Sequence, residues 1–152
     1  MACVTGCFIF IWKVVYPHSY HWINLSETII YFIYIVSHSL TMLVNQGVPS
    51  QKYLDMVNAL VENDKLNGIK DNSHYRKCNK CNINVLIKDN VVHCDDCGLC
   101  IIEYDHHCPW TSKCIGKYNF YIFHTFCVSI FILIFLTFST VLICLLNTIT
   151  KQ

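Results

Sequence analysis

The stretch EYDHHCPWTSKCIG, residues 103–116, places two acids, two histidines and two cysteines close together. Imidazole and thiolate groups serve as zinc ligands, and they also serve as a catalytic base and nucleophile. Two consecutive histidines do not both reach one metal ion in the usual local geometry, and Pro109 follows Cys108 at once. The stretch therefore raises the question of which groups hold a metal and which are available for reaction.

Seven of the eleven cysteines fall within one central part of the chain. Several are spaced like zinc knuckles, with two residues between cysteines, and His93 directly precedes the second group. A cluster of this density is either a disulfide framework or a zinc framework, and the redox compartment decides between them. The seven are Cys78, Cys81, Cys94, Cys97, Cys100, Cys108 and Cys114.

Composition predicts membrane segments. Charged residues make up 14% of the 152 residues and apolar residues 54%, whereas a soluble domain has about 25% charged residues. Residues 121–146 carry no charged side chain and are long enough to span a bilayer. Residues 28–44 are also uncharged and predict another membrane helix. Residues 1–16, which are apolar as far as Lys13, predict a short first one.

The basic residues predict the orientation. Nine of the eleven Lys and Arg residues lie between Lys52 and Lys117, so the loop between the second and third membrane helices is expected in the cytosol. Because the cytosol is reducing, the cysteine cluster is expected to bind zinc. With His93, His106 and His107 there are ten candidate ligands, two more than two tetrahedral zinc ions need, and composition leaves open which two are spare. The net charge of +1 gives no signal for nucleic acid.

The cytosolic loop has two predicted parts. Apolar residues at helical spacing predict a short amphipathic helix over residues 51–63, followed by a polar linker with a turn at Asn67-Gly68. The runs INVLIK and VVH flank Asp89-Asn90, which predicts a hairpin turn between them. No internal repeat is visible. The module is expected to be small β-hairpins fixed by metal, since it is too short for a conventional core.

The pattern from Cys78 to Cys114, with Asp-His-His-Cys at residues 105–108, resembles the cysteine-rich domain of the DHHC-type protein S-acyltransferases. CPW at 108–110, CIG at 114–116 and Asn119 also match, and NQGVP at 45–49 stands in the place of the family's Asp-Pro-Gly turn. The sequence departs from the family in a longer interval before His93 and in the absence of a Pro-x-Arg. The family's fourth helix and Thr-Thr-x-Glu motif do not occur in these 152 residues.

The resemblance implies an α-helical polytopic membrane protein with about three transmembrane helices and a small cytosolic zinc-bound module of short β-hairpins. Two structural zinc ions would bind in a crossed arrangement. The implied ligands are Cys78, Cys81, His93 and Cys100 for the first ion, and Cys94, Cys97, His107 and Cys114 for the second.

His106 and Cys108 are then left over for catalysis. The resemblance implies that Cys108 attacks an acyl-CoA such as palmitoyl-CoA, with His106 as base and Asp105 orienting the imidazole. The acyl chain would pass to cytosolic cysteine thiols of membrane-associated proteins. Trp110 is a candidate for lining the acyl pocket, although a tryptophan at a membrane interface is common in any case.

The implied division of the chain places two N-terminal transmembrane helices and a short lumenal loop at 1–48, and the cytosolic linker with its amphipathic helix at 49–74. The catalytic cysteine-rich domain follows at 75–120, the next transmembrane helix at 121–146, and a tail at 147–152. An endomembrane location, in the ER or Golgi with the active site facing the cytosol, is expected.

Other functions remain open at this point. The module could be an idle zinc scaffold or regulatory partner with inherited catalytic residues, or a truncated fragment of an acyltransferase. A membrane-bound zinc ubiquitin ligase is a third class, but it would use Cys108 or His106 as a ligand. The cations Arg76, Lys77, Lys113 and Lys117 could meet the phosphates of CoA or simply form a solvated surface.

Overall fold

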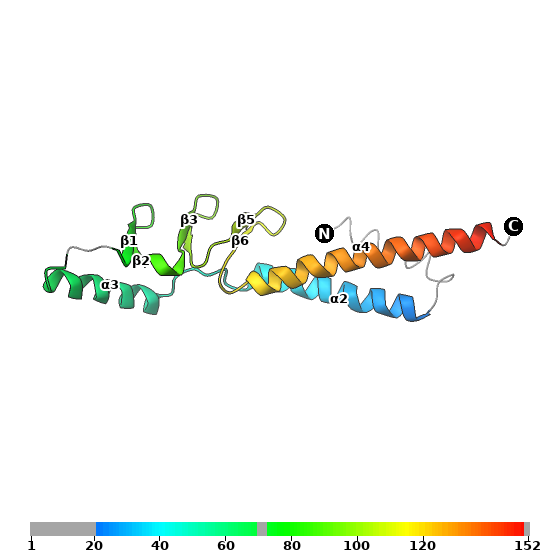
Figure 1. Cartoon of the computed structure of the whole chain (residues 1–152), viewed down its shortest axis with the longest axis horizontal. Helices are drawn as coiled ribbons and strands as arrows, with labels where there is room; N and C mark the ends of the chain where they lie inside the picture. The colour runs from blue at the N-terminus through cyan, green and yellow to red at the C-terminus, as the bar shows by residue number, and fades with distance from the viewer. Residues whose placement is uncertain (1–20, 70–72, 151–152) are drawn as a thin grey trace. The chain divides into compact units, whose positions relative to one another are not determined.

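The computed structural model describes residues 21–69 and 73–150 (Figure 1). They fall into two compact units, one running from His38 to Phe123 and the other combining residues 21–37 with residues 124–150. The predicted first membrane helix, at residues 1–16, lies outside the described residues. The elements in chain order are α2 (His21–Leu43), α3 (Gln51–Leu66), β1 (Tyr75–Cys78), β2 (Ile83–Leu86), the 3-10 helix η2 (Ile87–Asp89), β3 (Val92–Cys94), β4 (Leu99–Ile101), β5 (His106–Cys108), β6 (Lys113–Ile115) and α4 (Phe120–Ile149).

Helix α4 is long and strongly apolar. At about 1.5 Å per residue its 30 residues measure roughly 45 Å, which exceeds the ~30 Å thickness of the hydrocarbon core. Among the described residues it is the one helix both long and apolar enough to cross a membrane. The helix extends beyond the predicted 121–146 at both ends. Near its C-terminus, Thr148 Oγ1 donates to the carbonyl of Cys144 within the helix.

Helix α2 buries polar side chains and exposes apolar ones. In the unit that contains most of α2 and most of α4, Thr140 Oγ1 donates to Glu27 Oε1 over 2.6 Å, and the rings of Tyr34 and Phe126 lie 5.6 Å apart. Polar groups turned inward are what a lipid-facing helix requires, but a spanning role for residues 28–44 stays a prediction. The buried polar residues are Asn24, Glu27, Ser37, His38 and Thr41, and the most exposed apolar ones are Trp22, Leu25, Phe32 and Leu43.

Helix α3 is the amphipathic helix expected in the linker. It begins where Ser50 Oγ accepts from the backbone N–H of Tyr53 over 3.3 Å, a normal N-terminal cap. It ends at Leu66, three residues later than predicted, and Gly68 follows with a φ of +69°. Its buried face, Val57 and Val61, packs against Leu86 of the first hairpin. Helix α3 and the first hairpin therefore share one small apolar core.

The strands form three separate antiparallel hairpins, β1–β2, β3–β4 and β5–β6. The predicted hairpin turn at Asp89-Asn90 is wrong. Ile83–Leu86 forms an antiparallel pair with the preceding strand, Tyr75–Cys78. Asn90, with φ 43° and ψ 50°, ends η2 in the link between the first two hairpins. Asn adopts the left-handed conformation readily in such a link as well as in a hairpin turn, so the Asp-Asn pair alone does not distinguish the two.

The three hairpins repeat one local design, although no repeat is visible in the sequence. Each tip starts at a cysteine that closes the first strand, namely Cys78, Cys94 and Cys108. The fifth residue of each tip has positive φ, at Asn82 (54°), Gly98 (66°) and Ser112 (49°). Each second strand holds a buried aliphatic side chain at the same relative place, Val85, Ile101 or Ile115. The Cys-x2-Cys spacing marks the first two tips in the sequence, whereas the backbone shows that the third tip follows the same plan.

Two glycines allow the segment after α2 to lie directly on the hairpins. The carbonyl of Gly47 accepts from the N–H of Ile102 over 2.8 Å, and the carbonyl of Ile102 accepts from the N–H of Lys117 over 3.0 Å. A Cβ atom on Gly116 would lie 2.5 Å from the carbonyl oxygen of Gln46. The close approach of the chains therefore requires glycine at this position.

Asn119 connects the third hairpin to α4. Its side chain is fully buried; Oδ1 accepts from the N–H of Gly116 over 2.9 Å, and Nδ2 donates to the carbonyl of Cys114 over 3.0 Å. The carbonyl of Asn119 then accepts from the N–H of Phe123 in the first turn of the helix. One amide therefore fixes both the end of β6 and the beginning of α4.

Replacement of Asn119 by alanine is expected to destabilise the protein by about 2–4 kcal/mol, because it leaves a buried N–H and a buried carbonyl unpaired. Chemical denaturation of the detergent-solubilised protein measures this change. Asn84→Ala is the matched control, since its amide bonds only to Asn58 Oδ1 at an exposed position. Equal losses for the two variants would show that Asn119 has no special role.

Candidate active site and metal centres

The tip of the first hairpin and the strands of the second form one group of potential metal ligands. Nδ1 of His93 lies 3.8 Å from Sγ of Cys78, 3.1 Å from Sγ of Cys81 and 3.9 Å from Sγ of Cys100. His93 and Cys100 are cross-strand partners, which places both side chains on the same face of the β3–β4 hairpin. These four residues are the set that the family resemblance assigns to one zinc ion.

A second group repeats this plan one hairpin further along the chain. Nδ1 of His107 lies 3.7 Å from Sγ of Cys94, 3.3 Å from Cys97 and 3.7 Å from Cys114. His107 and Cys114 are cross-strand partners in β5–β6, and the other two cysteines come from the tip of β3–β4. Each group therefore links one hairpin to the next.

Both groups have the donors and dimensions of a tetrahedral zinc site. The four ligand atoms of each lie within 4.8 Å of one another, and a zinc ion with Cys3His ligands would hold N and S about 3.6 Å apart and two S about 3.8 Å apart. Burial and the neighbouring thiols of each group raise the pKa of Cys100 and of Cys114. Since several thiolates cannot share such a site alone, a divalent cation fits both groups.

His106 and Cys108 lie outside both groups. Successive side chains of a strand point to opposite faces, so His107 faces its metal ligands while His106 and Cys108 share the other face. The adjacent histidines are thus separated by the alternation of β5. Their separation makes two roles, metal binding and catalysis, sterically compatible within three consecutive residues.

The sulfur of Cys108 occupies a tip built like the two metal-binding tips. Its burial raises the pKa of the thiol, but hydrogen bonds from the side chain and backbone of Thr111, then from His106 and the backbone of Trp110, outweigh burial and lower the pKa. The amides that stabilise Cys78 and Cys94 occupy the same relative positions in their own tips. The third tip therefore favours a thiolate at Cys108 without a second cysteine.

His106 is held from two sides. Its Nδ1 lies 2.9 Å from Oδ2 of Asp105, and its ring meets the edge of the Phe123 ring at a centroid distance of 5.2 Å. Burial lowers the pKa of His106, but the hydrogen bonds to Asp105 and Cys108 more than offset it and raise the pKa. A carboxylate, an imidazole and a thiol of this kind can form a base-activated nucleophile.

Sequence reasoning did not single out Thr111 or Phe123. Thr111 is 2% exposed and stands three residues after Cys108, where the other two tips have Cys81 and Cys97. That spacing was the available signal. Phe123 carried no signal, because nothing in an apolar helix marks one phenylalanine as the neighbour of a histidine.

The structure shows the surroundings of Trp110 and of two of the candidate cations. Trp110 is 86% exposed, and it is not among the residues that line the two hollows beside the first hairpin. The guanidinium of Arg76 donates to the carbonyl of Val91, and Lys117 Nζ lies 2.8 Å from Glu103 Oε1. These two cations are bound within the protein.

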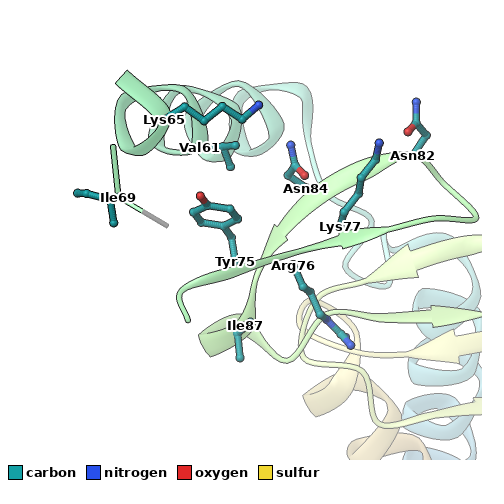
Figure 2. Close-up of a pocket in the computed structure, with 9 residues that line it drawn as sticks. All are labelled: Val61, Lys65, Ile69, Tyr75, Arg76, Lys77, Asn82, Asn84 and Ile87. Carbon is teal, nitrogen blue, oxygen red and sulfur yellow. The ribbon is translucent and has the colours of Figure 1, made fainter. Parts of the chain in front are cut away.

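Lys77 borders a hollow of about 640 Å³ between α3 and the first hairpin, shown in Figure 2. Lys65, Arg76, Asn82 and Asn84 line the same hollow.

Comparison with known proteins agrees with this geometry. The DHHC palmitoyltransferase family matches residues 71–152. Palmitoyltransferase PFA3 of Debaryomyces hansenii is 45% identical over 56 residues, which are 37% of this chain and 13% of that protein. Palmitoyltransferase ZDHHC8 of Drosophila melanogaster is 29% identical over 153 residues, 97% of this chain and 16% of that protein.

A third relative, palmitoyltransferase ZDHHC15 of Rattus norvegicus, is 43% identical over 56 residues, 36% of this chain and 16% of that protein. The chain thus spans less than a fifth of the length of these relatives. The family match covers the three hairpins, both groups of metal ligands and the whole of α4. The chain belongs to the DHHC palmitoyltransferase family.

Proposed function

We propose that this chain is a protein-cysteine S-acyltransferase that uses an acyl-CoA, with palmitoyl-CoA as the donor. The observation that carries the proposal is the meeting of Asp105, His106 and Cys108 outside both groups of metal ligands. The names of the relatives, all palmitoyltransferases, support the same reaction class. The acceptors would be cysteine thiols of membrane-associated proteins.

In the first half-reaction Cys108 loses its proton to His106, and the thiolate attacks the carbonyl carbon of the acyl-CoA thioester. The bond between that carbon and the sulfur of CoA breaks. The CoA thiolate leaves and takes the proton from the imidazolium, so that Cys108 carries the acyl chain as a thioester. The carboxylate of Asp105 stabilises the imidazolium while it exists, which supports its assignment as the orienting group.

In the second half-reaction the acceptor thiol gives its proton to His106 and attacks the acyl group on Cys108. The bond between the acyl carbon and Cys108 sulfur breaks, and the leaving thiolate recovers the proton. One thioester is exchanged for another in each half-reaction, so no redox partner or energy source is needed. The tip amides and Thr111 stabilise Cys108 as attacking group in one half and as leaving group in the other.

Two structural zinc ions are part of the proposal. When bound, they supply rigidity and not Lewis acidity, because protein ligands fill all four positions of each ion. The donor types and spacings of the two groups support this assignment. The ligands are Cys78, Cys81, His93 and Cys100 for one ion, and Cys94, Cys97, His107 and Cys114 for the other.

The membrane arrangement completes the proposal. Residues 1–48 contribute two transmembrane helices and a lumenal loop, residues 49–74 a cytosolic linker, residues 75–120 the catalytic domain and residues 121–146 a further transmembrane helix, with a tail at 147–152. The inward polar face of α2 supports its spanning role. The protein would reside in the ER or Golgi with Cys108 facing the cytosol, where acyl-CoA is available.

Metal analysis of the purified protein is expected to give two zinc ions per chain. Chelation should then unfold the hairpins, because their small cores include ligands such as Cys94, Cys100 and Cys114. Cys127→Ser, in α4 and outside both groups, is the control and should keep both ions. A parent protein with one ion or none would contradict the crossed scheme.

Three substitutions test the separate roles of neighbouring residues. His107→Ala should lose zinc and protease resistance. His106→Ala should keep both zinc ions but lose about 10²–10⁴-fold in the rate of acyl-CoA labelling, as expected for a missing general base. Cys108→Ser should keep the metal and carry no thioester-linked chain.

Zinc content measured beside acyl-CoA labelling decides the matter. Loss of zinc from His106→Ala or Cys108→Ser would mean that the roles are wrongly assigned. A parent protein that holds two zinc ions and never labels would refute the enzymatic proposal and leave a zinc scaffold.

The orientation is tested in sealed microsomes after zinc removal. A membrane-impermeant maleimide applied from the cytosolic side should label the cysteines between Cys78 and Cys114, because the basic residues lie around them. Microsomes opened with detergent give the total labelling for comparison. Labelling that appears only after opening would reverse the proposed topology.

A further inference from the structure

We propose that Lys113 is a positioning residue that sets the height of the Cys108 hairpin at the C-terminal end of α2. This inference rests on the proposed function and on α2 being a membrane helix, since the height of the hairpin then fixes the depth of the thiol relative to the bilayer surface. Lys113 itself would not touch the reacting atoms.

The contacts of Lys113 are short and specific. Its Nζ donates to the carbonyl of Met42 and to the carbonyl of Val44, each over 2.7 Å. All three residues belong to the compact unit that contains the hairpins. A single ammonium group therefore bridges two carbonyls at the end of α2.

The end of α2 needs such a partner. The last carbonyls of a helix have no N–H within the helix to accept from, and a cation there also interacts favourably with the helix dipole. The last turn of α2 contains no basic residue of its own. Lys113 supplies from the hairpin the charge that the helix lacks.

The place of Lys113 within the repeated hairpin design is informative. It lies directly opposite Cys108 in the β5–β6 pairing. The residues opposite the corresponding cysteines are Ile83 in the first hairpin and Leu99 in the second. The third hairpin thus has a charged residue where the other two have aliphatic ones, and this is the hairpin that carries the candidate nucleophile.

The consequence for reactivity follows from the pairing. Lys113 and Cys108 are neighbours across two short strands, so a shift of the lysine moves the thiol with it. The backbone contact of Gly47 with Ile102 holds the segment after α2, but Lys113 reaches the carbonyls at the end of the helix itself. Misplacement of a reacting group by about 1 Å can cost a hundredfold in rate.

The first test measures depth and does not depend on activity. Trp110 lies between Cys108 and Lys113 and is 86% exposed, so it reports the height of the tip. The chain has three tryptophans, and Trp12→Phe with Trp22→Phe leaves Trp110 as the reporter. The protein is reconstituted in vesicles with lipids brominated either near the headgroup or in the middle of the acyl chain, and quenching of Trp110 is compared.

With Lys113 present, the lipids brominated near the headgroup are expected to quench Trp110 more strongly. Lys113→Met should change the ratio of shallow to deep quenching, whereas Lys113→Arg should restore it because a guanidinium also donates to two carbonyls. Lys88→Met, which removes an exposed charge from η2, should leave the ratio unchanged. An unchanged ratio in Lys113→Met, or no quenching in the parent, would overturn the inference.

The second test links position to reaction. With both zinc ions retained, Lys113→Met should label with palmitoyl-CoA about 10- to 100-fold more slowly than the parent, and its preference among acyl-CoAs of different chain length should change. Lys113→Arg should recover the rate and the preference. If the parent labels and Lys113→Met labels equally well, positioning is refuted. A parent that never labels refutes the proposed function. In that case the quenching test, which does not depend on activity, still tests whether Lys113 sets the height of the hairpin.

Discussion

The rest of the hairpin module depends on one constraint, which is the gathering of four ligand atoms around one point in each of two successive groups. The buried clusters of the module are small, and Cys94, Cys100 and Cys114 are themselves members of them. Apolar burial alone would therefore not hold strands of three or four residues in place. Since each group joins the tip of one hairpin to the strands of the next, fixing one hairpin also fixes its neighbour.

The same constraint accounts for the candidate reactive site. The tips at Cys78 and Cys94 each meet a histidine and a cysteine from the following hairpin. After the third hairpin the described chain continues as α4, and in the third tip the thiol of Cys108 meets Thr111 of the same tip and His106 instead. A geometry suited to binding metal through thiolate thus becomes a geometry suited to presenting thiolate for reaction, because backbone amides stabilise the anion in either use.

The connection of the hairpins to α2 and α4 depends on polar groups in an apolar setting. Asn119 ties the end of β6 to the start of α4, and Lys113 ties the same hairpin to the end of α2. His106 packs against Phe123 in the first turn of α4. The candidate site is therefore positioned by contacts at helix ends, where unpaired backbone groups make such contacts favourable.

The sequence by itself determined the kind of protein and the candidate ligands. Knuckle spacings, the run from Asp105 to Cys108 and the uncharged stretch at 121–146 predicted metal, nucleophile and membrane helix, because each rests on residue type and local spacing. The allocation of ligands came from family resemblance. Only the tertiary structure decided how the strands pair: Asp89-Asn90 links two hairpins, and the repeat around Asn82, Gly98 and Ser112 lies in the backbone. The roles of Thr111, Phe123 and Lys113 likewise depend on which groups meet in space, and residue spacing carries little information about contacts between distant segments.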